Sequence, residues 1–393
     1  MFDVAVIGAG PVGSRFARNM AEQGVKTVVF EKKKRLDEAV CCTGIVSREF
    51  VEKYGISEDV IYRNANSASI FTPSGKLLHI ERDKPQAAVL NRPALNEYLG
   101  RYAIQSGADY RMNSNVVNIE KDARGVSVSV QSGHGPTETI RAKAVAITSG
   151  FGYRFTESAG FGRIRDFAMG VQAEVEAPEL KEVHVFLGEK TAPGFFGWLV
   201  PTASGRALAG LITRTKTAGF MKEFLEMLSN RGFIPRQEPS VSYAGVALRD
   251  IQRTSASRVM IIGSAAGQVK PLTGGGVYFG MMCADIAAQV LGQAFQADDL
   301  TSKSLANYDK EWKKALGKEI KVGYWGRRFY EQLSDRYIET LFDVVVTSGI
   351  NRTLLASDDV TFDWHGSIVL KLLRYQTIAG IVQAIVNPLK KNK

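Results

Sequence analysis

Cysteines and long apolar runs are both scarce in this chain. Three cysteines in 393 residues are too few for a disulfide framework, and this count fits a reducing compartment. No window offers about 18 uninterrupted apolar residues, so we expect no segment to span a bilayer. The start, MFDVAVIG, has no basic region before its apolar stretch, which predicts a first strand and not a signal peptide. The expected location is the cytoplasm, with peripheral membrane association left open.

Basic motifs interleaved with aromatic residues are also missing. The formal charge is +10, but lysines and arginines are scattered, apart from clusters at 32–35 and at the C-terminus. We therefore expect no nucleic-acid partner. The adjacent Cys41 and Cys42 have no histidine nearby, so we expect no metal site. With 45% hydrophobic and 23% charged residues, the composition is that of a soluble globular chain with two or more domains.

Glycine, by contrast, is abundant, and two segments are rich in it; the first of them follows a strand-like run at 2–7. Gly8, Gly10 and Gly13 have the spacing GxGxxG and are followed by a predicted helix. In such loops the three glycines allow a tight turn, close approach of a pyrophosphate, and packing of helix on strand. Glu31 ends the next predicted strand, where its carboxylate can accept the hydroxyl groups of an adenosine ribose. The predicted nucleotide contacts are Gly8, Gly10, Pro11, Val12, Gly13, Glu31 and Lys32.

The second glycine-rich segment, at 259–280, also runs from a predicted strand through glycines into a helix. Its three consecutive glycines open the helix with bare backbone amides. A helix start of this kind suits the pyrimidine end of a flavin, where reduction places negative charge. Two such loops suggest one extended cofactor held at both ends, and FAD is the prediction, although the lysines at 32–34 keep NADP open. The predicted contacts here are Gly263, Ser264, Gly274, Gly275 and Gly276.

Three further groups of residues lie between the two loops. Arg92, at the entrance of a predicted helix at 89–111, can reach a cofactor phosphate or the ribityl chain; a surface salt bridge is the alternative. Cys42, Thr43 and Gly44 place a thiol next to a ring system, unless one cysteine is simply buried and the other incidental. Within 193–201, the aromatic side chains wall an apolar cavity or belong to an ordinary core hairpin. The predicted residues of that cavity are Phe196, Trp198 and Pro201.

The order of strand-like and helix-like segments predicts an α/β (α+β) fold with interleaved domains. A Rossmann-like FAD-binding domain with a parallel sheet occupies 1–165 and 251–300. An antiparallel-sheet, substrate-facing domain occupies 166–250, and a helical region follows at 301–393. The last stretch, 365–393, mixes apolar turns with basic residues, so a membrane surface, a lipid tail or plain packing are all open as its partner.

Together these motifs resemble the geranylgeranyl reductase family, within the p-hydroxybenzoate-hydroxylase-like flavoproteins. GSAAGQVKPLTGGGVYFG is similar to the family's flavin segment G-D-A-A-G-x-x-x-P-x-T-G-G-G-I-x-x-G, and Cys42 begins a C-x-G-[IL] motif. PGFFGWLVP is similar to the family's lipid-pocket motif P-x-x-Y-x-W-x-F-P, and Arg92 matches its flavin-contacting arginine. Three residues depart from the pattern: Ser264 replaces an aspartate that contacts the ribityl chain, Phe196 a tyrosine and Val200 a phenylalanine.

The resemblance implies an FAD-dependent oxidoreductase that saturates carbon–carbon double bonds of a prenyl lipid with hydride from flavin N5. We predict Cys42 as the proton source or as a gate over the flavin. The external reductant is NAD(P)H or a ferredoxin, which makes an electron-donor protein a second expected partner. Two alternatives stay open: a flavin-dependent monooxygenase or halogenase of the same fold, and a flavin- or lipid-binding protein without turnover.

Overall fold

The computed structural model describes residues 1–357 and 361–372. The chain divides into two compact units, each assembled from three separate stretches. Unit 1 consists of Met1–Val40, Arg92–Phe167 and Gly245–Ile320. Unit 2 consists of Cys41–Asn91, Ala168–Ala244 and the chain from Lys321 onward.

Unit 1 is built on an eight-stranded sheet. β1 (Phe2–Ile7) pairs in parallel with β2 (Thr27–Phe30) on one side and with β11 (Thr137–Ile147) on the other. Parallel pairing continues to β8 (Asp109–Arg111) and to β18 (Val259–Ile261). The antiparallel strands are β9 (Ser114–Lys121), β10 (Val126–Ser132) and β17 (Ser255–Ala256). The central strands are almost continuously apolar because parallel sheets are covered on both faces.

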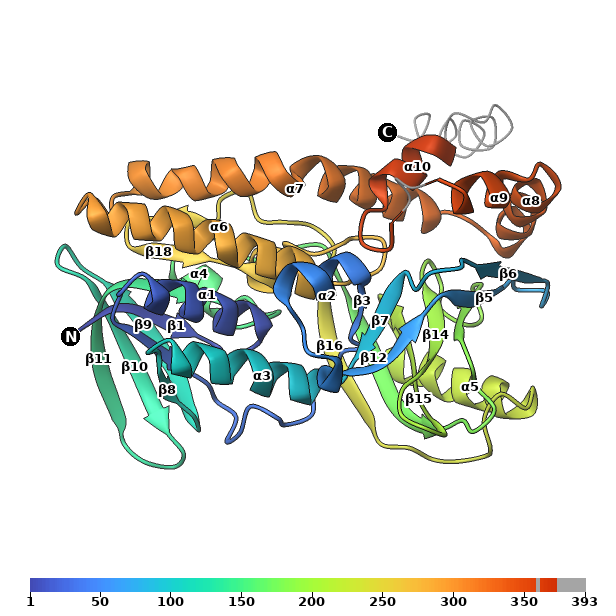
Figure 1. Ribbon diagram of the computed structural model, residues 1–393, viewed down its shortest axis with the longest axis horizontal. Coiled ribbons are helices and arrows are strands. Elements are labelled where there is room, and N and C mark those ends of the chain that lie inside the picture. The colour runs from blue at the N-terminus through green and yellow to red at the C-terminus, as the bar shows by residue number, and fades with distance from the viewer. Residues whose placement is uncertain (358–360, 373–393) are drawn as a thin grey trace. The chain divides into compact units, whose positions relative to one another are not determined.

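Three long helices accompany this sheet: α1 (Pro11–Glu22), α3 (Arg92–Gln105) and α6 (Val277–Gln296). α1 packs against both α3 and α6 (Figure 1). The short elements of the unit are α4 (Arg154–Ser158) and the 3-10 turn η2 (Gly263–Ala266). The segment predicted as one helix at 89–111 contains the helix α3, but its first residues belong to β7 (Ala87–Leu90) and its last residues to β8 (Asp109–Arg111). The predicted helix is too long because the apolar pattern continues into these strands.

Unit 2 contains a seven-stranded sheet that is mainly antiparallel. Its strands are, in spatial order, β16 (Val241–Ala247), β12 (Phe167–Glu176), β15 (Arg206–Thr213), β14 (Phe196–Pro201), β13 (Val183–Leu187), β5 (Ser67–Phe71) and β6 (Leu77–Glu81). β13 pairs with β5 in parallel, whereas β12, β15, β14 and β13 pair in sequence as antiparallel strands. A three-stranded antiparallel sheet is formed by β3 (Ile45–Ser47), β7 (Ala87–Leu90) and β4 (Ile61–Ala65).

The remaining helical elements of unit 2 are α2 (Arg48–Tyr54), η1 (Glu58–Val60), α5 (Thr217–Asn230), α8 (Asp335–Thr347), α9 (Ile350–Leu355) and α10 (Gly366–Leu372). The chain passes from unit 1 to unit 2 within α7 (Ser302–Tyr330). In the described ranges, none of the helices combines the length and hydrophobicity that crossing a bilayer requires. Most of the basic stretch at 365–393 lies outside the described residues, which end at 372.

The two units divide the chain differently from the predicted domains. β5 and β6 come from the first predicted domain, yet β5 pairs with β13 of the predicted substrate domain. β5 and β13 lie far apart in the sequence, so no local pattern predicts that they pair. That FAD binds to the domain at 1–165 and 251–300, and the substrate to the domain at 166–250, stays a prediction.

Candidate functional site

The first glycine loop lies at the carboxyl end of β1, in unit 1. Gly8 has a φ of 101°, and a methyl group there would lie 2.9 Å from the carbonyl oxygen of Thr148. A methyl group at Gly13 would lie 1.9 Å from the carbonyl oxygen of Gly8, so α1 reaches the loop only without a side chain there. At Gly10, no described atom lies within 4 Å of the corresponding position. The loop therefore keeps an open backbone face at Gly10, which fits the approach of a pyrophosphate.

The start of α1 has features that favour the binding of an anion. Its N-cap, Gly10, makes no side-chain hydrogen bond, and Pro11 occupies the first helical turn, where its missing N–H costs nothing. The first turn carries no acidic residue. The backbone N–H groups of a helix start, together with the helix dipole, favour negative charge at this point. The residues present thus fit the phosphates of FAD.

Glu31 is held against the same loop by two backbone N–H groups. Ala9 N donates to Oε2 at 2.8 Å and Lys33 N donates to Oε1 at 3.0 Å. Both carboxylate oxygens keep further lone pairs, so the group can still accept ribose hydroxyls. The Lys33 ammonium turns back to the carbonyl groups of 38–39, and burial lowers its pKa. Lys32, the predicted contact, is exposed.

Arg92 begins α3 and is only 7% exposed. Its guanidinium donates to Oδ1 of Asn96 at 3.3 Å, and its positive charge adds to the effect of burial in lowering the pKa of Lys33. Arg92 thus acts electrostatically on the loop that carries Glu31. The side chain is thus buried and not on the surface, and its contact with the cofactor stays a prediction.

Val12 brings the two glycine segments together inside unit 1. A methyl group at Gly263 would lie 3.1 Å from Cγ2 of Val12, and one at Gly280 would lie 2.6 Å from the same atom. Val12, in the first turn of α1, therefore packs directly on the backbone of the second segment and of α6. Both segments are predictable from the sequence, but this contact places them side by side, as one extended cofactor requires.

Buried polar groups that sequence reasoning missed hold both loops in place. Thr148 Oγ1 donates to the carbonyl oxygens of Ile7 and Gly8, each at 2.9 Å. In the second segment, Gly263 N donates to Oε1 of the fully buried Gln268 at 2.7 Å. Gln268 in turn donates from Nε2 to the Tyr308 hydroxyl at 2.9 Å. A glutamine in the middle of this glycine-rich segment is a signal that could have pointed to this support.

The glycine triplet at 274–276 directly precedes α6. Gly274 has a φ of 75°, which only glycine adopts readily. A methyl group at Gly276 would lie 2.9 Å from the Ser264 hydroxyl, so Ser264 lies against the triplet. A methyl group at Gly275 would lie 2.5 Å from Cε of Lys270. The predicted residues of this segment are thus close together at the start of one helix.

The predicted thiol segment lies in unit 2. The Thr43 hydroxyl donates to Oε1 of the buried Gln172 at 2.7 Å, and Gly44, with a φ of 74°, leads into β3. Cys42 is half-buried. Its neighbour Cys41 donates to the carbonyl oxygen of Ser242 at 3.3 Å, and burial raises the pKa of the Cys41 thiol. The structure therefore distinguishes the two thiols, and the role of Cys42 stays a prediction.

Phe196 and Trp198 occupy alternate positions of β14 and therefore point to the same face of the sheet. Their rings meet edge to face with centroids 6.1 Å apart. The Trp198 ring covers Gly210 of β15, where a methyl group would lie 2.4 Å from Cζ2. Its Nε1 is buried and has no hydrogen-bond partner among the described residues. Pro201 is buried at the end of the strand, opposite Ala207.

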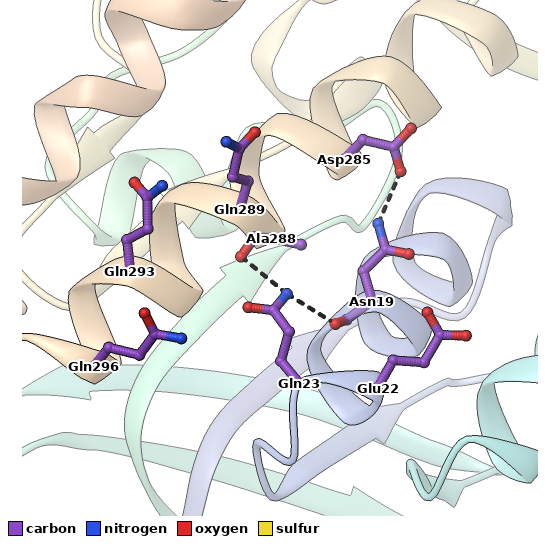
Figure 2. Close-up of a pocket in the computed structure, with 8 residues that line it drawn as sticks. All are labelled: Asn19, Glu22, Gln23, Asp285, Ala288, Gln289, Gln293 and Gln296. Atoms are coloured by element: carbon purple, nitrogen blue, oxygen red, sulfur yellow. Dashed lines mark hydrogen bonds between the residues drawn. The ribbon is translucent and has the colours of Figure 1, made fainter.

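A separate surface pocket of about 480 Å³ lies between α1 and α6. Figure 2 shows the residues that line it, all of them polar or charged except Ala288: Asn19, Glu22, Gln23, Asp285, Ala288, Gln289, Gln293 and Gln296. Asn19 of α1 donates to Asp285 of α6 at 2.8 Å, and Gln23 donates to the carbonyl oxygen of Ala288 of α6 at 3.4 Å. None of the predicted site residues lines this pocket, and its hydrogen bonds join the two helices.

A family model described as FAD binding domain matches residues 1–316. A digeranylgeranylglycerophospholipid reductase from Methanocaldococcus jannaschii is 28% identical over 358 residues, which cover 88% of this chain and 90% of that protein. Among solved structures, a geranylgeranyl bacteriochlorophyll reductase-like protein from Thermoplasma acidophilum has a TM-score of 0.85 at 22% identity, covering 98% of this chain and 99% of that one. A flavin-dependent brominase has a TM-score of 0.70 at 14% identity over the full length of both chains.

These comparisons confirm four of the predictions, among them FAD as the cofactor and FAD-dependent oxidoreductase as the class of protein. The resemblance to geranylgeranyl reductases is confirmed by the named relatives, and the α/β fold with a Rossmann-like cofactor domain is confirmed by the family match and the structural likeness. At identities of 22% and 14%, the two solved structures speak for the fold alone.

Proposed function

Because the chain belongs to the FAD binding domain family, we propose that it is a reductase that saturates carbon–carbon double bonds of an isoprenoid lipid. FAD is its cofactor, and its class is FAD-dependent oxidoreductase. The observation that carries the finer proposal is the M. jannaschii relative, a digeranylgeranylglycerophospholipid reductase that matches 88% of this chain. A relationship over nearly the whole length includes the predicted substrate segment as well as the cofactor loops.

The residues of unit 1 are suited to the two ends of FAD. The open backbone at Gly10 and the start of α1 bind the pyrophosphate, and Glu31 accepts the ribose hydroxyls. The glycine triplet before α6 directs its amides to the pyrimidine end of the flavin. When bound and reduced, FAD supplies a hydride from N5 to one carbon of the double bond.

The protein must supply the proton and the dry surroundings. An unactivated alkene has no carbonyl group that holds developing charge, so water has to be excluded from the reacting carbons. Phe196 and Trp198 give β14 an aromatic face suited to an isoprenoid chain. Cys42 is the proposed proton source for the second alkene carbon, and its thiolate regains a proton from solvent. NAD(P)H or a ferredoxin as electron donor, and peripheral membrane association, stay predictions.

Anaerobic incubation of the dithionite-reduced holoprotein with geranylgeranyl lipids, followed by mass spectrometry, tests the proposal. The expected product gains the mass of two hydrogen atoms for each double bond that is reduced. A product that gains an oxygen atom, and only when air is admitted, would contradict the proposal and favour a monooxygenase. Transfer of hydrogen limited to one equivalent per bound flavin, with no turnover under excess reductant, would favour a carrier.

A halogenase of the same fold is the second candidate, and a flavin-dependent brominase is one protein that has this fold. A halogenase needs oxygen and halide, whereas the proposed reductase needs neither. Incubation in air with bromide and a reductant separates the two, because only a halogenase gives a brominated product.

A further inference from the structure

Lys270 is a buried cation at the start of α6 for which the proposed reaction has no step. It is 5% exposed, although lysine is among the residues least often buried. Its backbone is joined to the glycine triplet on both sides: Lys270 N donates to the carbonyl oxygen of Gly275 at 2.9 Å, and Gly274 N donates to that of Lys270 at 2.8 Å. These two bonds fix the direction in which the side chain leaves the loop.

The side chain follows the backbone of Gly275. A methyl group on Gly275 would lie 2.5 Å from Cε and 3.0 Å from Nζ of Lys270. Glycine at this position therefore makes room for the ammonium group. The Thr273 hydroxyl would lie 3.7 Å from the same methyl group, and it is buried without a hydrogen-bond partner in the described ranges. A cation and an unpartnered hydroxyl thus converge on one glycine.

The placement is electrostatically unusual. α6 is a helix of 20 residues, and the N-terminus of a helix carries partial positive charge. Cations are favourable at the opposite end, so an ammonium group here adds to a potential of the same sign. The first turn of α6 contains no acidic residue, and Ser264, which lies against Gly276, is neutral. Lys270 also interacts with other groups of the protein. Its charge acts in addition on whatever is bound at the start of α6.

We propose that Lys270 places a fixed positive charge at the pyrimidine end of the bound flavin, where it stabilises the reduced anion and raises the flavin's reduction potential. The proposal rests on the proposed function, because it requires FAD in this site. Reduction by a two-electron donor such as dithionite adds two electrons to the flavin and one proton, from water, to N5. The remaining negative charge lies on the pyrimidine ring, and Lys270 is not a reactant in this step.

The test compares the holoproteins of wild type, K270M, K270Q and K270R. Their potentials are measured anaerobically against a reference dye during slow reduction. K270M and K270Q are expected to lower the equilibrium constant for reduction at least tenfold, which is about 30 mV for a two-electron couple. K270R keeps the charge and should stay within threefold of wild type.

Lys143 provides the matched control for net charge. It pairs with Asp3 at 2.8 Å near the start of β1, whereas the first glycine loop follows the end of that strand. K143M removes the same charge and should leave the potential unchanged. Sulfite gives a second readout, because its addition to N5 of oxidised flavin also leaves negative charge on the pyrimidine ring. Its dissociation constant should rise in K270M and K270Q only.

Equal potentials and equal sulfite affinities in wild type, K270M and K270Q would overturn the inference alone. A wild-type protein that takes up no FAD would overturn the proposed function and the inference with it. If a variant releases its flavin during purification, dissociation constants for oxidised and reduced FAD are measured by titration. The ratio of these constants reports the same shift in potential, and a ratio equal to that of wild type contradicts the proposal.

Discussion

Replacement of Gly10 by alanine is expected to separate cofactor binding from folding. Gly10 has a φ of −68° and a ψ of 180°, a conformation that any residue adopts. The added methyl group meets no described atom within 4 Å. If the pyrophosphate approaches this part of the backbone, the methyl group touches only the cofactor. We therefore expect the apoprotein to fold like wild type and to bind FAD weakly.

The effect on folding is the difference of two small terms. Alanine restricts the unfolded chain more than glycine does, which stabilises the fold by about 0.4–1 kcal/mol. As the N-cap of α1, alanine is worse than glycine by roughly the same amount. The free energy of unfolding should thus change by less than about 1 kcal/mol. The loss of a single charge-assisted hydrogen bond to phosphate, about 1.5–3 kcal/mol, weakens FAD binding tenfold or more.

Urea unfolding of the apoprotein and fluorescence titration with FAD measure the two effects separately. G13A is the contrasting variant: its methyl group overlaps the carbonyl oxygen of Gly8, so overpacking of about 1–3 kcal/mol should lower stability as well as affinity. G219A is the control for FAD affinity, because Gly219 of α5 has open space at the same position. Wild-type affinity in G10A, with G13A impaired, would refute a pyrophosphate at Gly10.

Three other changes are expected to give measurable results. In E31Q, the amide NH2 group faces one of the two backbone N–H groups that now donate to Glu31, so one hydrogen bond is lost. The free energy of unfolding should fall by about 1 kcal/mol, and the affinity for FAD should fall in the same titration. C42S should slow lipid reduction if the thiol supplies the proton; unchanged turnover of C42S and C42A would leave Cys42 with packing only. Burial lowers the pKa of His184 below 6.5, so the folded state favours the neutral ring. The free energy of unfolding should therefore fall as the pH falls below 6.5, because the unfolded chain then binds a proton more readily than the folded one. The loss between pH 7 and pH 5 in urea unfolding should be smaller in H184N, and an equal loss in both proteins would contradict this assignment.

The first nucleotide loop could be predicted because its determinants are local. The apolar run of β1, the three glycines, α1 and Glu31 follow one another in the sequence, and each has a role set by backbone geometry. The structure agrees down to the difference between Gly10, which faces open space, and Gly13, which faces Gly8. The antiparallel return of β9 and β10 to β11 is likewise a short-range pattern, and it is present.

Contacts between distant segments could not be predicted in this way. Nothing in the first loop indicates that Val12 packs on Gly263 and Gly280, since a valine in a helix is equally suited to any apolar neighbour. The same holds for the parallel pairing of β5 with β13, which lie far apart in the sequence. Thr148 supports the loop through two side-chain hydrogen bonds, and threonine at the end of a strand has many other uses.

Ser264, which departs from the family's flavin motif, lies near Lys270 at the glycine triplet. Ser264 and Lys270 lie against neighbouring members of the glycine triplet, Gly276 and Gly275. An aspartate in place of Ser264 would bring a carboxylate close to the buried ammonium, and two opposite charges at short range largely cancel in their effect on a third group. With serine there, the charge of Lys270 and the amides at the start of α6 act on the cofactor in the same direction. If FAD is bound as proposed, this one substitution would weaken the hold on the ribityl chain and strengthen the pull on electrons.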